Sequence, residues 1–135
     1  MKLVYPAVLL PFEEGECYTI TIPDLPGCVS EGSYLADALL RGADAASGWV
    51  LDELEDGKAT PSVSSLNDVA SANPEAIVTY LVLDMDSYAE RYGKKAIRKN
   101  ITIPAYMNAY VEDNNLSLSE ITQNAIASLI QNQQK

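Results

Sequence analysis

The sequence predicts an α+β protein built from two parts. Residues 1–90 hold alternating apolar runs that are typical of strands and one long amphipathic helix, whereas the remainder holds one short strand and two helices. The charge changes at the same point: residues 1–90 carry 3 basic and 16 acidic side chains, and residues 91–135 carry 6 basic and 3 acidic ones. We therefore expect a domain at 1–90, a basic linker at 91–96 and a second domain at 97–135.

Two apolar runs open the chain and predict a hairpin. Residues 2–12 are apolar on both alternating sets, which predicts a strand buried on both faces, although Pro6 favours an edge or irregular position. Residues 17–22 alternate between apolar and polar, and the Glu-Glu-Gly-Glu segment at 13–16 supplies the turn between the two runs. The prolines at 23 and 26 then take the chain out of the sheet.

A long helix follows the hairpin and is expected to cover the sheet. Ser33 is a plausible N-cap, and the helix reaches about Asp56. Its apolar stripe consists of Leu35, Leu39, Ala43, Ala46, Val50 and Leu54. Residues 59–74 have the composition of a loop that could hold one helical turn, and residues 76–83 predict a further strand.

The second part is predicted to need another copy of itself. Residues 97–103 alternate as a strand, Pro104 opens a helix that ends near Asp113, and Ser117 with Glu120 forms a capping box for a second helix. A lone strand leaves its backbone donors and acceptors unpaired at both edges. A homodimer in which two copies pair these strands into a ribbon satisfies them.

One face of that ribbon carries side chains suited to reading DNA. Arg98, Asn100 and Thr102 alternate with the isoleucines, and a two-stranded ribbon fits the major groove, where arginine and asparagine read guanine and adenine. A dimerisation module without DNA is one alternative. A helix-turn-helix with the second helix as reader is the other, but it leaves the strand unexplained.

Two further groups are candidate phosphate contacts. Lys94 and Lys95 lie in the basic linker, where they would bind the DNA backbone independently of its sequence. Ser117 and Ser119 place backbone N–H groups at the start of the last helix, where a phosphate could dock.

An acidic cluster at the end of the long helix has two interpretations. It comprises Asp52, Glu53, Glu55 and Asp56. Negative charge at a helix C-terminus is unfavourable by up to about 1 kcal/mol per group. The cluster serves either solubility or the steering of a basic protein partner.

Enzyme motifs are missing from the sequence. The chain has no histidine, its seven glycines form no phosphate-binding loop, and its two cysteines make neither a zinc site nor a disulfide framework. We expect no catalytic residue, no metal site and no cofactor. No apolar run approaches the roughly 20 residues of a membrane span, and the first ten residues lack the features of a signal peptide, so we expect a cytoplasmic protein that does not contact a membrane.

Two stretches of the chain resemble known families. The Arg-Lys-Asn-Ile-Thr-Ile-Pro segment at 98–104, followed by two helices, resembles a ribbon-helix-helix repressor domain. Tyr-Pro-Ala at 5–7, the run 18–32 with its Pro-Asp-Leu-Pro-Gly-Cys core, Ala-Asp-Ala at 36–38 and Trp49 resemble the HicB antitoxins. The resemblance covers nearly the whole chain except about 59–74. Lys99 departs from an all-apolar inner face of the ribbon.

The resemblance implies both a fold and a function. It implies a partial, degenerate RNase H-like domain at 1–90 that binds a small basic HicA-type toxin, which cleaves mRNA. It also implies repression of the operon that encodes the pair, through operator DNA, by a dimer or a tetramer. A repressor that senses a small ligand and a metal-dependent RNase H-like enzyme are the competing functions. The reading frame beside the gene distinguishes the antitoxin from the sensor.

Overall fold

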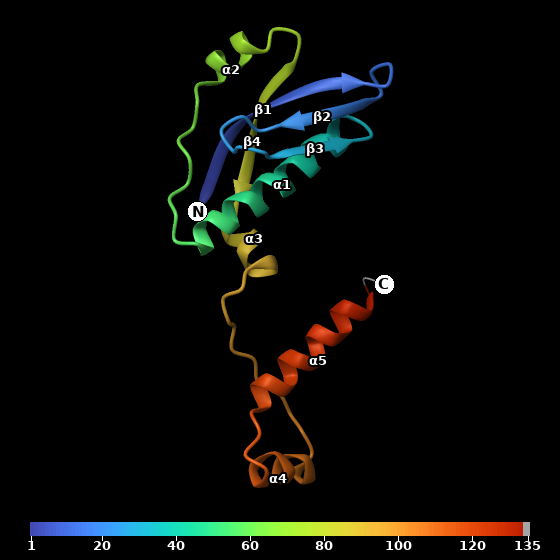
Figure 1. Ribbon diagram of the computed structural model, residues 1–135, viewed down its shortest axis with the longest axis vertical. Helices are drawn as coiled ribbons and strands as arrows, with labels where there is room; N and C mark the ends of the chain where they lie inside the picture. The colour runs from blue at the N-terminus through green and yellow to red at the C-terminus, as the bar shows by residue number, and fades with distance from the viewer. Residues whose placement is uncertain (134–135) are drawn as a thin grey trace. The chain divides into compact units, whose positions relative to one another are not determined.

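The computed structural model describes residues 1–133 and divides the chain into two compact units, Met1–Lys95 and the residues from Ala96 onward (Figure 1). The first unit combines a sheet with helices, which confirms the predicted α+β class. The described part of the second unit holds two helices.

The sheet of the first unit has four antiparallel strands in the order β3-β2-β1-β4. The strands are β1 (Lys2–Phe12), β2 (Cys17–Thr21), β3 (Val29–Gly32) and β4 (Ile77–Asp84). The predicted hairpin is confirmed by the β1–β2 pairing, which runs from Val8 opposite Thr21 to Phe12 opposite Cys17. Left-handed backbone at Glu13, Glu14 and Gly15 makes the turn.

Pro6 does not lie in an edge strand, because β1 is central in the sheet. β4 pairs with residues 2–9 of β1, whereas β2 pairs only from Val8 onward, so Pro6 has one strand neighbour. The Met85 N–H donates to the Met1 carbonyl at 3.0 Å. This bond shows which residue pairs of β1 and β4 are hydrogen-bonded and which are not. Odd-numbered residues of β1 therefore exchange hydrogen bonds with β4, and the missing N–H of Pro6 falls on the unpaired side.

β1 is buried on one face and only partly on the other. Tyr5, Ala7 and Leu9 face α1 (Leu35–Glu55) in the core, whereas Val4 and Leu10 on the opposite face are exposed. The prediction of burial on both faces is confirmed at the centre of the strand, where Pro6 and Val8 on the second face are also buried, and was wrong at Val4 and Leu10. A sequence of uniformly apolar residues does not reveal where the cover of the second face ends.

Small residues let α1 approach the sheet closely. A Cβ added at Gly42 would lie 2.5 Å from the Ile20 Cδ1 atom, and one at Gly32 would lie 2.2 Å from the Ala38 nitrogen. The buried helix residues are Ala38, Gly42, Ala46, Ser47, Val50 and Leu51. The predicted stripe was correct at its centre but wrong at Leu35, which is exposed. The helix also starts one residue later than predicted, with Tyr34 rather than Ser33 at the N-cap.

The connection from α1 to β4 runs along the sheet and is fixed by specific hydrogen bonds. The Tyr5 hydroxyl donates to the Pro61 carbonyl at 2.7 Å, and Asp24 accepts from the Ser64 N–H at 2.8 Å. The segment then forms α2 (Leu66–Ala72), which contacts β4 and β1. After β4, α3 (Met85–Tyr92) starts at Asp84, whose carboxylate accepts from the Ser87 N–H.

The second unit contains α4 (Ala105–Asp113) and α5 (Leu118–Gln133). The predicted cap is present, because the Ser117 Oγ accepts from the Glu120 N–H at 3.3 Å. Residues 97–103 form no strand in this single chain. A strand needs a hydrogen-bonded neighbour, and the described residues of one chain offer none here. The paired ribbon therefore stays a prediction.

Candidate functional site

The acidic cluster of residues 52, 53, 55 and 56 lies at the end of α1 and faces solvent. Asp52, Glu55 and Asp56 are exposed. Glu53 is half-buried, and its Oε1 atom forms an ion pair with Lys58 Nζ at 3.7 Å. The last turn of α1 has no basic residue, so the helix dipole adds to the negative potential. A basic protein approaching this end of the unit would be attracted. The cluster is thus placed where steering is physically feasible.

The end of α1 lies beside the segment that follows β4. α1 contacts α3, and the Glu55 Oε1 accepts from the backbone N–H of Lys94 at 3.3 Å. The ring of Tyr88 in α3 stacks against Tyr92 with centroids 4.7 Å apart. Burial raises the pKa of Tyr88, and the nearby carboxylates of Asp44 and Asp52 raise it further. The carboxylates of Asp44 and Asp52 on α1 therefore lie close to Tyr88 of α3.

The predicted phosphate and base contacts fall into different units. Lys94 and Lys95 belong to the first unit, whereas Arg98, Asn100 and Thr102 belong to the second. All five side chains are exposed. The basic stretch thus spans the boundary between the two units, with Lys94 and Lys95 in the first unit and Arg98 in the second.

The start of α5 matches the expected geometry of a helix N-terminus. The Ser117 Oγ caps Glu120, and Ser119 is exposed. Capping by Ser117 already occupies the N–H of Glu120. Fewer free N–H groups are then left for a phosphate than the sequence suggested.

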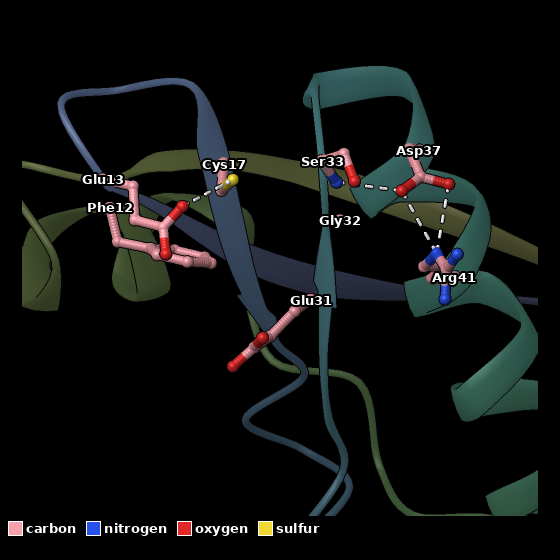
Figure 2. Close-up of a pocket in the computed structure, with 8 residues that line it drawn as sticks. All are labelled: Phe12, Glu13, Cys17, Glu31, Gly32, Ser33, Asp37 and Arg41. Carbon is pink, nitrogen blue, oxygen red and sulfur yellow. Dashed lines mark hydrogen bonds and ion pairs between the residues drawn. The ribbon is translucent and has the colours of Figure 1, made fainter.

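A shallow hollow of about 360 Å³ lies where the β1–β2 turn meets β3 and the start of α1 (Figure 2). Its lining comprises Phe12, Glu13, Cys17, Glu31, Gly32, Ser33, Asp37 and Arg41. Sequence reasoning missed this hollow because β3 was not predicted. The Val-Ser-Glu-Gly strand has a single large apolar residue, and its signal is too weak to identify.

Asp37 organises one wall of the hollow. Its carboxylate accepts from the Ser33 N–H at 2.9 Å and from Arg41 Nε at 3.1 Å, as Figure 2 shows. The Ser33 N–H, followed by the Arg41 guanidinium, lowers the pKa of Asp37. Asp37 thus ties the first turn of α1 back to Ser33, whereas no side chain provides the N-cap hydrogen bond that was expected of Ser33. Arg41 is neutralised by this pair and is poorly placed to bind an added anion.

Cys17 lies on the opposite wall, with its thiol 3.6 Å from the Glu13 carboxylate. Burial, followed by the hydrogen bond and charge of Glu13, raises the pKa of the Cys17 thiol. A thiol held protonated is a poor nucleophile and a poor metal ligand. Within residues 1–133, no three His, Cys, Asp or Glu side chains gather as a metal site.

Over the described range, no helix combines the length and the apolar character needed to cross a bilayer.

The chain thus combines a strongly acidic α+β unit with a second unit whose described part holds two helices. A family model for HicB-like antitoxins of bacterial toxin–antitoxin systems matches residues 5–131. The chain belongs to this family and is an antitoxin of a toxin–antitoxin system.

Individual proteins and solved structures are also similar to this chain. An uncharacterized 14.9 kDa protein from the rep-hol intergenic region of Haemophilus phage HP1 is 29% identical over 105 residues, which cover 78% of this chain and 76% of that protein. A chain from a toxin–antitoxin complex of Streptococcus pneumoniae superposes with a TM-score of 0.68 and 21% identity, covering 95% of this chain and 99% of that one. The antitoxin HicB of Burkholderia pseudomallei superposes with a TM-score of 0.56 and 24% identity, covering 96% and 98%. Its N-terminal domain alone is 27% identical, with a TM-score of 0.52, covering 61% of this chain and 99% of that domain.

Proposed function

We propose that this antitoxin neutralises a small basic HicA-type toxin that cleaves mRNA, and that it represses its own operon by binding operator DNA. In this proposal the unit at 1–90, a partial RNase H-like domain, binds the toxin. The residues from 97 onward form a ribbon-helix-helix dimer that binds DNA, and pairs of dimers can form tetramers. The protein acts in the cytoplasm without cofactor, metal or catalytic activity of its own.

The observation that carries the DNA-binding half is the exposure of apolar residues in the second unit. None of the described residues from Ala96 onward is buried. The exposed large apolar side chains are Ile97, Ile101, Tyr106, Met107, Tyr110, Leu116, Ile121, Ile126, Leu129 and Ile130. Two short helices with no buried face gain too little free energy to stay folded in water. A second copy that covers these side chains supplies the missing core.

The same dimer gives residues 97–103 the neighbour they need. Pairing two copies of this segment would satisfy its backbone groups and place Arg98, Asn100 and Thr102 on one face. Ile101 and Ile103 would then turn toward the helices. The absence of a strand in the single chain is consistent with a ribbon that forms only on dimerisation.

The charge of the first unit supports its role in binding a basic partner. Residues 1–95 carry 6 basic and 16 acidic side chains. We expect reversal of Asp52, Glu53, Glu55 and Asp56 to lysine to slow association with the toxin at low salt, and less so at high salt. An unchanged association rate would return these acids to the solubility role.

Co-expression with the adjacent reading frame tests the toxin half. A small basic protein from that frame should co-purify with the full chain, and the chain should restore growth. A fragment of residues 1–90 should fold and still protect cells. Protection by the full chain alone would place the toxin contacts elsewhere. Metal-dependent RNA cleavage by the purified antitoxin, lost on mutation of one of its own carboxylates, would contradict a non-catalytic role.

Operator binding across a salt series tests the DNA half. Asn100→Ala should cost roughly 1–3 kcal/mol at one base position and leave toxin inhibition intact. Lys94→Ala should weaken binding to every sequence and reduce the salt slope by about one unit. An unrelated duplex is the control. Wild-type affinity in Asn100→Ala, or binding by a monomer, would favour the helix-turn-helix alternative.

A further inference from the structure

β4 forms an unusually open edge of the sheet. It is eight residues long and pairs only with β1, so among the described residues no strand lies on its outer side. Residues 77–83 contain neither a charged residue nor a proline. The opposite edge, β3, has four residues and includes Glu31 and Gly32. Short or charged edges resist pairing with other chains, whereas a long uncharged edge invites it.

The outward-facing backbone groups of β4 can be assigned to particular residues. The Met85 N–H donates to the Met1 carbonyl, and the register pairs Leu83 with Leu3 and Leu81 with Tyr5. Hydrogen-bonded and non-hydrogen-bonded pairs alternate along an antiparallel ladder. The odd-numbered residues of β4 therefore bond to β1. The N–H and C=O groups of residues 78, 80 and 82 point to the open side.

Apolar side chains line the same edge on the face away from α1. Val82 is 63% exposed, Tyr80 is 45% exposed, and Val4, opposite Val82 in the register, is 42% exposed. A strand added beside β4 would place its own side chains next to Val82 and Tyr80. The edge thus offers main-chain hydrogen bonds and an apolar surface together.

The charges at both ends of β4 identify the kind of strand that fits. Glu75 precedes the strand and Asp84 is its last residue, whereas Asp86 is already paired with the N-terminal ammonium of Met1. A second copy paired antiparallel about Tyr80 would bring Glu75 close to the partner's Asp84, so like charges would meet at both ends. A basic strand would place positive charge there instead. The acidic end of α1 lies near the same end of β4, because α1 contacts α3, which directly follows β4.

We propose that the outer edge of β4 receives a strand of a basic protein partner, which extends the sheet by one strand. This inference rests on the proposed function, since the basic toxin is the partner in question. It adds the docking surface and the mode of recognition. The acids at the end of α1 would then steer the partner, while β4 supplies the lasting contact.

Val82→Pro tests the main-chain hydrogen bonds directly. Proline removes the outward N–H of residue 82 but takes no hydrogen bond from the β1 ladder. The toxin is recovered from the co-expressed complex in denaturant, refolded and titrated with the full-length antitoxin. We expect roughly tenfold weaker binding, which corresponds to the loss of a backbone hydrogen bond. Fluorescence of Trp49, the one tryptophan in the chain, reports whether the first unit of the variant is folded.

Two matched variants separate this loss from other effects. Val82→Thr keeps the N–H and the branched shape, so it should weaken binding less than Val82→Pro. Leu40→Ala removes an apolar side chain from the outer surface of α1, where Leu40 is 71% exposed, and should leave affinity unchanged. Loss of affinity in Leu40→Ala, with Val82→Pro unaffected, would place the toxin on α1 and overturn the inference.

Hydrogen exchange on the wild-type pair gives a test that needs no mutation. The amides of residues 78, 80 and 82 should become protected in the complex, and unchanged exchange there would overturn the inference. The mass of the antitoxin alone should be the same in Val82→Pro and wild type. A smaller mass in the variant would show that a second copy occupies the edge, which also overturns it. Failure of the wild type to bind the toxin at all would instead refute the proposed function.

Discussion

Substitution of Gly42 by alanine tests the close packing of α1 on the sheet. An added Cβ would lie 2.5 Å from Ile20 Cδ1 and 3.1 to 3.2 Å from two further Ile20 atoms. Ile20 is fully buried, so its side chain has no free space to move into. We expect Gly42→Ala to lower the free energy of unfolding of the first unit.

The expected magnitude follows from two opposing effects. Overpacking of a core costs about 1–3 kcal/mol. Replacing glycine by alanine within a helix recovers about 1 kcal/mol. The net loss at Gly42 should therefore lie between about 0 and 2 kcal/mol. Gly48 lies in the same helix, but an added Cβ there meets only the Tyr88 hydroxyl group at 3.1 Å. Gly48→Ala is thus the matched control and should be neutral or stabilising by up to about 1 kcal/mol.

Urea unfolding followed by the fluorescence of Trp49 measures these changes in the first unit alone. Ile20→Val removes the Cδ1 atom that the new Cβ would strike, so it should relieve the strain of Gly42→Ala. The double variant should be more stable than the sum of the single effects predicts, by about 1 kcal/mol. Additive effects, or equal behaviour of Gly42→Ala and Gly48→Ala, would refute the packing argument.

Two further predictions concern single side chains of the first unit. Asp37→Asn should destabilise the unit at pH 7, because the Ser33 N–H and Arg41 lower the pKa of Asp37 in the folded state. That contribution is present above the unfolded pKa of about 3.8 and is lost as the pH falls through the lower folded value, so the difference from wild type should shrink between pH 4 and pH 2. A pH-independent difference in urea midpoint would contradict this. Tyr5→Phe should cost about 1 kcal/mol in the same assay, because the hydroxyl donates a partly buried hydrogen bond to the Pro61 carbonyl; no change would show that water replaces this bond.

Local sequence patterns were enough to predict the helices and strands whose apolar residues recur with a clear period. The β1–β2 hairpin, the centre of α1 and β4 were all predicted, because alternation and helical spacing are properties of neighbouring residues. β3 was missed because its pairing with β2, rather than its composition, makes it a strand. Contacts between distant residues cannot be read from a period.

Glycine and proline show the same limit in physical terms. Gly42 inside a helix predicts instability when taken alone, yet the structure needs its missing side chain beside Ile20. Pro6 predicts an edge strand, yet β1 is central and pairs on one side only at that point. In both cases the conformational preference of the residue was correct, but the packing or pairing around it depended on residues distant in the sequence.

The candidate sites divide along similar lines. The acids at the end of α1 could be located from sequence, since a helix end and its charges are local features. The hollow around Asp37 and Arg41 could not, because it joins the β1–β2 turn to β3 and α1. The residues expected to read DNA remain a prediction, since their arrangement depends on a second chain.

The two units differ in how their stability depends on protein concentration. The first buries Tyr5, Leu9 and Ile20 completely within one chain, so its fold does not depend on a second copy. The described part of the second unit buries no side chain, so its folding and its dimerisation would be one equilibrium that dilution weakens. In the proposed function, toxin binding by the first unit would therefore persist at concentrations too low for the dimer. Operator binding would begin only once the antitoxin has accumulated, so repression would follow neutralisation rather than compete with it.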